Sequence, residues 1–406
     1  MSTKVVCVVG LGYIGLPTAA LLATNGYQVV GVDLNPHAVA TINQGQIHIV
    51  EPDLDAYVRS AVVAGKLKAY ATPQQADIYM ICVPTPFHEG GDIPQPNIDF
   101  VLAAARGIAH LVKPGNLVIL ESTSPVGTTQ RMSEILQEAG ADLSSVHLAY
   151  CPERVLPGKI MTELVENDRV VGGLTPEATR LVSNFYRTFV RGEVLETDAQ
   201  TAEMCKLAEN SYRDVNIAFA NEMSLLCTKA GINVWRLIQL ANRHPRVNIL
   251  QPGAGVGGHC IAVDPWFIVA RDPKNARLIR TAREVNNFKT EWVIDQIKIA
   301  MDAALTRTGR KPRVACLGLA FKPDIDDLRE SPALHIALRL QMQGYDVVAV
   351  EPNISSHNEL SLVDLEEALA ISDVAALLVK HKQFVEPSVK EKLHASGAMD
   401  FCGVGI

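Results

Sequence analysis

The stretch Val5-Val-Cys-Val-Val-Gly10-Leu-Gly12-Tyr-Ile-Gly15 decides the fold of the first part of the chain. Its first five residues are all apolar, which is typical of a central parallel strand buried on both faces. A helical stretch follows from Leu16 to Asn25, and a second apolar run, Gln28–Val32, ends in Asp33. A glycine fingerprint between strand and helix, with an acid closing the next strand, predicts a dinucleotide-binding unit.

The glycine turn is the expected cradle for the cofactor pyrophosphate, because an anion is favoured at a helix N-terminus. Asp33 is placed to accept hydrogen bonds from a ribose diol and to repel a 2′-phosphate, which predicts NAD rather than NADP. A glycine turn without a ligand is the alternative for this stretch alone. The residues expected to hold the cofactor here are Gly10, Gly12, Tyr13, Ile14, Gly15 and Asp33.

Two further strands, Ile78–Val83 and Asn116–Leu120, end in threonine-bearing turns. Ligands of open α/β sheets bind at the carboxyl ends of the strands. Thr85, Thr123 and Thr129 are therefore candidates to line the nicotinamide half of the cleft, although threonine is also an ordinary turn residue. A strand over Val146–Tyr150 leads into a proline-bracketed loop with Glu153 and Arg154, which is either a substrate-facing loop or a surface ion pair.

Thr201–Ala230 contains no proline or glycine and predicts one long helix. At about 100° per residue, one third of its circumference is polar. We interpret this stripe as the wall of a cleft that holds an oxygen-rich ligand, with a solvated face as the alternative. Its members are Lys206, Asn210, Arg213, Asp214 and Asn221.

A basic loop follows the long helix, with Arg243, His244 and Arg246 around a proline. It is either an anion clamp or an exposed charged turn. Next, several glycines precede Cys260, and Asp264 follows four residues later. Such a loop could bring backbone close to a ligand and present a nucleophilic thiol. A tight turn with a buried cysteine is the alternative.

A second α/β unit is expected after a helix and a linker. The helix is predicted over Asn275–Asn287 and continues through Glu291–Ala304, and the breaker-rich linker is Thr306–Pro312. The unit then has strands at Arg313–Leu317, Asp346–Val350 and Val374–Val379, and a helix from Pro332. The second strand and the residues after it repeat the pattern of the N-terminal unit, with Glu351 in the place of Asp33. The second unit lacks the glycine fingerprint and carries Lys322 and Arg329 around its first turn, so we expect a Rossmann-like domain for a phosphate-bearing ligand other than a dinucleotide.

Composition excludes several classes of function. The chain has 406 residues, a formal net charge of −7 and no basic run, so nucleic acid and anionic membranes are not expected partners. Its eight cysteines include no Cys-x-x-Cys pair, which favours reduced thiols in a cytoplasmic protein and argues against a metal site. No apolar run reaches the ~18 residues of a membrane span.

Six segments together resemble the UDP-glucose/GDP-mannose dehydrogenase family over essentially the whole chain. They are Gly10–Gly15, Tyr150–Gly158 (YCPERVLPG), Ala202–Asn210 (AEMCKLAEN), Asn242–Pro252 (NRHPRVNILQP), Gly255–Phe267 (GVGGHCIAVDPWF) and Phe321–Pro332 (FKPDIDDLRESP). The resemblance implies a four-electron oxidation of a sugar-nucleotide primary alcohol to a carboxylate, with two NAD⁺ used in turn, for surface polysaccharide synthesis. It also implies a homodimer and a UDP-sugar substrate.

The resemblance assigns a role to each residue that matches a family motif. Cys260 matches the nucleophile, whose thiolate we expect to be favoured by nearby cations such as Lys206. Lys206 and Asn210 match the groups that stabilise the oxyanion at C6, and Asp264 and Glu153 match carboxylates that position or activate water. Arg329 matches an arginine near the cofactor. The expected substrate contacts are Arg154, Val155, Lys206, Asn210, Arg213, His244, Arg246 (from the neighbouring subunit), Gly257 and Lys322.

The expected architecture is therefore an α/β fold of two Rossmann-like domains joined by a long central helix in a helical domain. The predicted boundaries are 1–197 for NAD binding, 198–304 for the dimerising domain with the catalytic loop, and 305–406 for UDP-sugar binding. The chain departs from the family pattern at two places. Pro157 stands where relatives acting on UDP-glucose carry a second acid, which favours a 2-acetamido sugar. The tail from Asp400 lacks the usual basic or aromatic ending, so its role is open.

Overall fold

The computed structural model describes residues 3–88, 90–258 and 260–405, and the chain forms two compact units, Met1–Ala208 and Glu209–Ile406. The division falls within helix α8 (Ala199–Ala230), the long helix that the sequence predicts from Thr201. None of the helices in the described ranges is both long and apolar enough to cross a membrane.

The first unit is built on an eight-stranded sheet of order β10-β9-β8-β7-β4-β1-β2-β3, parallel except where β8 meets β9. Its remaining elements are β1 (Val5–Val9), α1 (Gly15–Thr24), β2 (Gln28–Val32), α2 (Pro36–Asn43), α3 (Leu54–Val63), β3 (Leu67–Tyr70), β4 (Ile78–Ile81), the hairpin β5 (Phe87–His88) and β6 (Gln95–Pro96), α4 (Asp99–Ala109), β7 (Leu117–Leu120), α5 (Thr128–Glu138), β8 (His147–Tyr150), α6 (Ile160–Glu166), β9 (Arg169–Gly173), α7 (Pro176–Tyr186) and β10 (Val194–Asp198).

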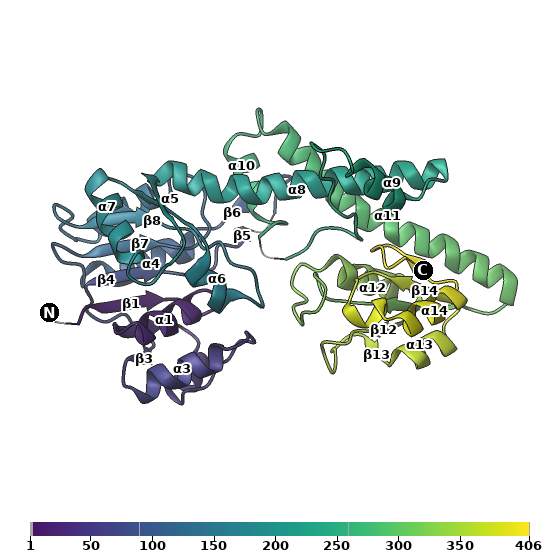
Figure 1. The fold of residues 1–406 in the computed structure, drawn as a ribbon, viewed down its shortest axis with the longest axis horizontal. Coiled ribbons are helices and arrows are strands. Elements are labelled where there is room, and N and C mark those ends of the chain that lie inside the picture. The colour runs from purple at the N-terminus through teal and green to yellow at the C-terminus, as the bar shows by residue number, and fades with distance from the viewer. Residues whose placement is uncertain (1–2, 89, 259, 406) are drawn as a thin grey trace. The chain divides into compact units, whose positions relative to one another are not determined.

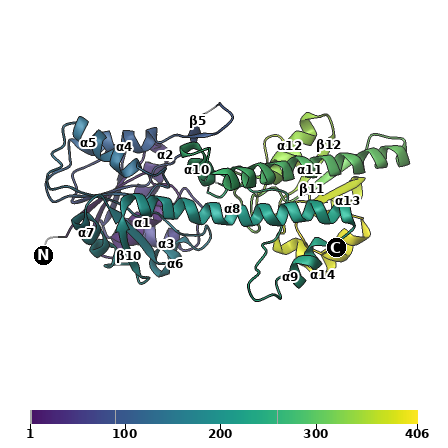
Figure 2. The ribbon, with the colours of Figure 1, turned by 90° about the horizontal axis from the view of Figure 1, so that it is seen from above.

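Alternate residues of β1 serve two hydrophobic cores, as the two-residue period of a strand requires. Val6 and Val8 pack with α1, α3, α6 and α7, whereas Cys7 and Val9 pack with α4 and α5 on the other face. Figure 2 shows α4 and α5 on one side of the sheet and α1, α6 and α7 on the other. Helices therefore cover both faces of the central strands.

The second unit is built on a parallel five-stranded sheet of order β13-β12-β11-β14-β15. Helices α11 and α12 cover one face, and α13 and α14 cover the other (Figure 1). The elements are α9 (Val234–Ala241), α10 (Asp264–Arg271), α11 (Arg277–Thr308), β11 (Arg313–Leu317), α12 (Pro332–Met342), β12 (Asp346–Val350), β13 (Ser361–Leu362), α13 (Leu365–Ile371), β14 (Val374–Leu377), the 3₁₀ helix η1 (Lys382–Val385), α14 (Pro387–Ala395) and β15 (Met399–Asp400).

The two units repeat one strand order, since β3-β2-β1-β4 in the first corresponds to β13-β12-β11-β14 in the second. The first strand of each starts level with the second, with Val5 paired to Gln28 and Arg313 paired to Asp346. The prediction of two Rossmann-like α/β units and a long helix is therefore confirmed.

The predicted linker at Thr306–Pro312 is partly wrong, because α11 continues to Thr308 and ends at Gly309 with a φ of 68°. The hydroxyls of Thr306 and Thr308 donate to the carbonyls of Asp302 and Ala304 one turn earlier. These bonds keep polar residues in the last turn of the helix, so only about the last four residues of the predicted linker connect to β11.

Candidate active site

The glycine turn after β1 fits a dinucleotide pyrophosphate. A Cβ on Gly10 would lie 2.6 Å from the carbonyl oxygen of Cys82, and one on Gly15 would lie 1.7 Å from that of Gly10. Packing of the turn and of α1 therefore requires glycine at both positions. A Cβ on Gly12 would meet nothing within 4 Å, so the backbone there faces open space that a phosphate group could approach. Tyr13 and Ile14 are half-buried beside it.

Asp33, directly after β2, holds the glycine turn and remains partly exposed. Its Oδ2 accepts from the N–H of Leu11 at 2.9 Å, and its Oδ1 accepts from the N–H of Asn35 at 2.8 Å. Each carboxylate oxygen can accept a further hydrogen bond. The arrangement suits the ribose diol of NAD.

The threonines at the strand ends have defined partners. Thr85 donates from Oγ1 to the carbonyl of Thr123 at 2.7 Å, which joins the turns after β4 and β7. Thr129 is fully buried, and its hydroxyl donates to Glu203 Oε1 at 2.7 Å. The hydroxyl predicted to lie beside the nicotinamide thus already has a protein partner, and the role of Thr129 there stays a prediction.

Glu203 is a positioning residue that sequence reasoning missed. This fully buried carboxylate of α8 also accepts from the N–H groups of Gly127 (2.6 Å) and Thr129 (2.8 Å) at the start of α5. Unpaired N–H groups at a helix N-terminus favour a carboxylate. Glu203 therefore ties α8 to the turn after β7, three residues before Lys206. The available signal was an acid inside the motif that contains Lys206.

Lys206 and Glu153 form a buried ion pair in the first unit. Lys206 Nζ lies 3.1 Å from Glu153 Oε1 and donates to the Glu153 carbonyl at 2.8 Å. Their side chains are 7% and 11% exposed. The second carboxylate oxygen of Glu153, Oε2, accepts from the N–H of Val155 at 2.9 Å. The surface-ion-pair alternative for Glu153 is thus wrong, because its partner is a buried lysine of α8.

The loop that carries Glu153 is fixed at both sides. Buried Glu51 accepts from the N–H group of Gly158 (2.8 Å), two residues before α6, and from that of Ile160 (2.7 Å), the first residue of α6. Arg154 donates from Nη1 to the carbonyl of Asp168 at 3.1 Å. Glu51 is a second acid that the sequence did not single out, because its partners lie more than a hundred residues away.

In the second unit, Cys260 and Asp264 lie one turn apart at the start of α10. The N–H groups of Val263 (3.0 Å) and Asp264 (2.8 Å) both donate to the Cys260 carbonyl. Cys260 is half-buried and Asp264 is 2% exposed. Asn210 of α8 donates from Nδ2 to Asp264 Oδ2 at 2.5 Å. The Asn210 amide therefore orients the Asp264 carboxylate, which follows the Cys260 thiol by four residues.

The glycines before Cys260 have a packing role. A Cβ on Gly257 would lie 2.3 Å from the carbonyl oxygen of Glu330, and one on Gly258 would lie 2.7 Å from the Phe321 ring. The predicted reason for these glycines was close approach to a ligand. In the structure they let the loop approach the segment that precedes α12, which leaves the substrate role of Gly257 a prediction.

The polar stripe of α8 is only partly available to a ligand. Asp214 and Asn221 are buried against α11, where Asp214 accepts from Arg283 at 2.7 Å and Asn221 donates to Asn286 at 2.9 Å. The cleft interpretation is therefore wrong for these two residues. Arg213 is exposed, as are His244 and Arg246 in the basic loop, where the N–H of Arg246 donates to His244 Nδ1 at 3.3 Å.

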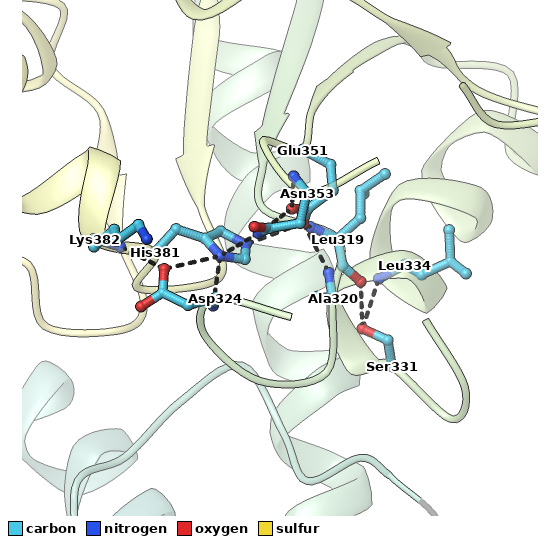
Figure 3. Close-up of polar contacts among 9 residues, drawn as sticks. All are labelled: Leu319, Ala320, Asp324, Ser331, Leu334, Glu351, Asn353, His381 and Lys382. Atoms are coloured by element: carbon cyan, nitrogen blue, oxygen red, sulfur yellow. Dashed lines mark hydrogen bonds and ion pairs between the residues drawn. The ribbon is translucent and has the colours of Figure 1, made fainter. Parts of the chain in front are cut away.

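The turn after β11 is organised by Glu351 and His381 (Figure 3). Glu351 Oε2 accepts from the N–H groups of Leu319 (2.7 Å) and Ala320 (3.0 Å) and lies 3.0 Å from His381 Nε2. The N–H of Asp324 donates to His381 Nδ1 at 3.0 Å, so Nε2 carries the proton that Glu351 accepts. Burial alone would raise the pKa of Glu351, but these hydrogen bonds outweigh it and lower the pKa to about 2.

The two cations predicted around this turn differ in setting. Lys322 is half-buried. Arg329 is exposed and bound to Asp327, with Nε 2.8 Å from Oδ1 and Nη2 2.5 Å from Oδ2. Within the described residues, no group of three or more His, Cys, Asp or Glu side chains is arranged to hold a metal ion.

Known proteins match the chain throughout. Models of the UDP-glucose/GDP-mannose dehydrogenase family match residues 4–190 (NAD binding domain), 200–288 (central domain) and 315–404 (UDP binding domain). The UDP-N-acetyl-D-mannosamine dehydrogenase of Escherichia coli (strain K12) is 57% identical over 402 residues, 95% of each chain. The NDP-N-acetyl-D-galactosaminuronic acid dehydrogenase of Ralstonia nicotianae is 55% identical, covering 94% of this chain and 92% of its own.

A solved structure of a UDP-D-ManNAc dehydrogenase from Pyrococcus horikoshii is 36% identical, with a TM-score of 0.88 over 98% of this chain and 96% of its own. The match to the NAD binding domain confirms the cofactor predicted from the glycine turn and Asp33. The resemblance seen in six short segments is likewise confirmed, and the chain belongs to the UDP-glucose/GDP-mannose dehydrogenase family.

Proposed function

We propose that the protein oxidises the C6 hydroxyl of UDP-N-acetyl-D-mannosamine to a carboxylate, using two NAD⁺ for each sugar. The observation that carries the proposal is the half-buried Cys260 thiol one turn before an Asp264 carboxylate oriented by Asn210. A two-electron alcohol dehydrogenase needs no such thiol. The choice of sugar rests on the names of relatives more than 50% identical to the chain and on Pro157.

In the proposed mechanism, the glycine turn Gly10–Gly15 and Asp33 would hold NAD⁺, which would supply the hydride acceptor for each of the two oxidations. Lys206 gives a proton to Glu153, then takes the proton of the C6 hydroxyl and, with Asn210, stabilises oxygen charge at C6. Such preorganised donors contribute roughly 3–4 kcal/mol each. The buried pairing of Lys206 with Glu153 gives the released proton a carboxylate acceptor next to the lysine.

Cys260 then retains the half-oxidised sugar. Its thiolate adds to the C6 aldehyde, the adduct loses the second hydride, and the product is a thioester. Water attacks this thioester with Asp264 or Glu153 accepting the proton, which releases the carboxylate and regenerates the thiol. A covalent adduct prevents escape of the aldehyde while NADH is exchanged for NAD⁺.

The proposal includes a homodimer formed through α8. Tyr212, Phe219 and Leu226 are spaced seven residues apart and are 71%, 53% and 54% exposed. Residues at this spacing form one stripe along a helix, which is typical of packing against a second helix. In the proposed dimer, this stripe of one protomer packs against the same stripe of a second copy. The exposed Arg246 of each protomer would then reach the sugar bound to the other. We also propose a cytoplasmic location, which suits the eight cysteine thiols of the chain.

Steady-state kinetics with four sugar nucleotides test the substrate. We expect the highest kcat/KM for UDP-N-acetyl-D-mannosamine, with two NADH formed per sugar. UDP-N-acetyl-D-galactosamine is the second candidate, because the Ralstonia relative is 55% identical. Equal or better turnover of that sugar, of UDP-N-acetylglucosamine or of UDP-glucose would refute the choice. One NADH per sugar would refute the four-electron mechanism.

A further inference from the structure

Lys289 of α11 is a buried cation outside the proposed active site. It is 3% exposed, and its Nζ donates to Ser224 Oγ of α8 at 2.8 Å. The same nitrogen lies 4.0 Å from the centre of the Trp292 ring. No carboxylate within the described ranges forms an ion pair with it. A buried lysine normally has such a partner, because desolvating an unpaired charge is costly.

Lys289 and its partner Ser224 both line a cavity of about 310 Å³. Trp235, Trp292 and Phe401 contribute its aromatic walls, with the Trp292 and Phe401 rings edge to face at 6.2 Å. Small-molecule sites have this size and character, with apolar walls and a few convergent polar groups. Lys289 can donate three hydrogen bonds and gives one to Ser224, so it has donors for an oxyanion in the cavity.

The unusual C-terminal tail forms one side of this cavity. Asp400, the other charged side chain in the lining, accepts from the N–H groups of Cys402 (3.0 Å), Gly403 (2.7 Å) and Gly405 (2.8 Å). A Cβ on Gly403 would lie 2.7 Å from Trp235 ring carbons. The Asp400 carboxylate is therefore hydrogen-bonded to the backbone of the tail, and the tail packs against Trp235 at Gly403.

We infer that this cavity binds a small organic anion, with the anion's carboxylate on Lys289 Nζ and its flat apolar part against Trp235, Trp292 and Phe401. The carboxylate would supply the missing counter-charge in surroundings where charge-assisted hydrogen bonds are strong. Binding should also depend on pH. Burial lowers the pKa of Lys289 to about 7, so above neutrality the anion must also bring a proton onto the amine.

Benzoate and its neutral analogue benzamide test the inference by calorimetry and by tryptophan fluorescence. Saturating UDP is present, which occupies the proposed sugar-nucleotide site. We expect one benzoate per chain and binding of benzamide at least tenfold weaker. Between pH 6 and pH 8.5 the affinity for benzoate should fall roughly thirtyfold, since each unit above a pKa of about 7 costs a factor of ten.

The variant Lys289→Met should weaken benzoate binding at least tenfold. Lys298→Met is the matched control on the same helix, where the lysine is paired with Asp295 at 3.6 Å, and it should bind like wild type. Equal affinities for benzoate and benzamide, unchanged binding in Lys289→Met, or no binding of benzoate in the presence of UDP would each overturn the inference. The comparison of benzoate with benzamide uses the wild-type protein and does not depend on how the variants fold.

Discussion

Replacing Glu351 with glutamine should destabilise the second unit by about 2–3 kcal/mol at neutral pH. Both carboxylate oxygens are used: Oε2 accepts from two backbone N–H groups and His381, and Oε1 accepts from the N–H of Asn353 at 3.0 Å and from its Nδ2 at 2.9 Å. An amide can offer an oxygen to only one of these sides (Figure 3). The lowering of the pKa from 4.5 to about 2 corresponds to an upper bound of about 3 kcal/mol, at 1.36 kcal/mol per unit.

Tryptophan fluorescence during urea unfolding measures this change selectively. The three tryptophans, Trp235, Trp266 and Trp292, all lie in the unit Glu209–Ile406. Glu351→Gln should lower the midpoint of the fluorescence transition. Glu391→Gln, in an exposed position of α14, is the control and should change the free energy of unfolding by less than about 0.5 kcal/mol.

The pH dependence gives a second readout. Because the folded pKa of Glu351 is lowered, its contribution is present above the unfolded value near 4.5 and is lost as pH falls toward about 2. The difference between wild type and Glu351→Gln should therefore shrink by roughly half between pH 7 and pH 3. The reasoning is refuted if the variant unfolds at the wild-type midpoint at pH 7, or if the difference is the same at both pH values.

Three other substitutions test the remaining parts of the site. Asp33→Ala should weaken NAD binding and reduce discrimination against NADP in fluorescence titrations, and unchanged selectivity would contradict the assigned role. Cys260→Ser should stall at a slowly hydrolysed ester, seen by mass spectrometry, because an alkoxide leaves less readily than a thiolate; full multiple turnover would exclude covalent catalysis. Glu203→Gln should lower the unfolding free energy of the first unit by about 1–3 kcal/mol in circular dichroism, since it removes a charged acceptor from the α5 N-terminus; wild-type stability would show that the contact contributes little.

The sequence predicted the first two strands of each unit with little error. Val5–Val9, Gln28–Val32, Arg313–Leu317 and Asp346–Val350 have the predicted bounds. A central parallel strand is buried on both faces, so its apolar run begins and ends with the strand. The end of α11 was less predictable, because threonine side chains bonding back to helix carbonyls extended it through a breaker-rich stretch.

Local parts of the candidate site could be read from the sequence, whereas contacts between distant segments could not. The sequence placed the Asp264 carboxylate four residues after the Cys260 thiol, and the structure places the two residues one turn apart. The partner of Lys206 is 53 residues away, and that of Glu51 is 107 residues away at Gly158. Such pairs depend on how the sheet and the helices pack. From the residue types alone, each of these charged side chains could equally lie exposed on the surface.

The acid after the second strand is partly exposed in the first unit and buried in the second, although both units have the same strand order. Asp33 and Glu351 each follow the second strand, and each accepts from the N–H of the residue after the first glycine of the turn, Leu11 or Leu319. In the second unit, His381, four residues after β14, donates to the acid and buries it. In the first unit the residue four positions after β4 is Thr85, and Asp33 stays partly exposed, which suits the binding of a ribose. The second unit therefore differs from the dinucleotide-binding unit in two ways, because it lacks the glycine fingerprint and because a histidine after β14 covers the acid that a ribose would otherwise contact.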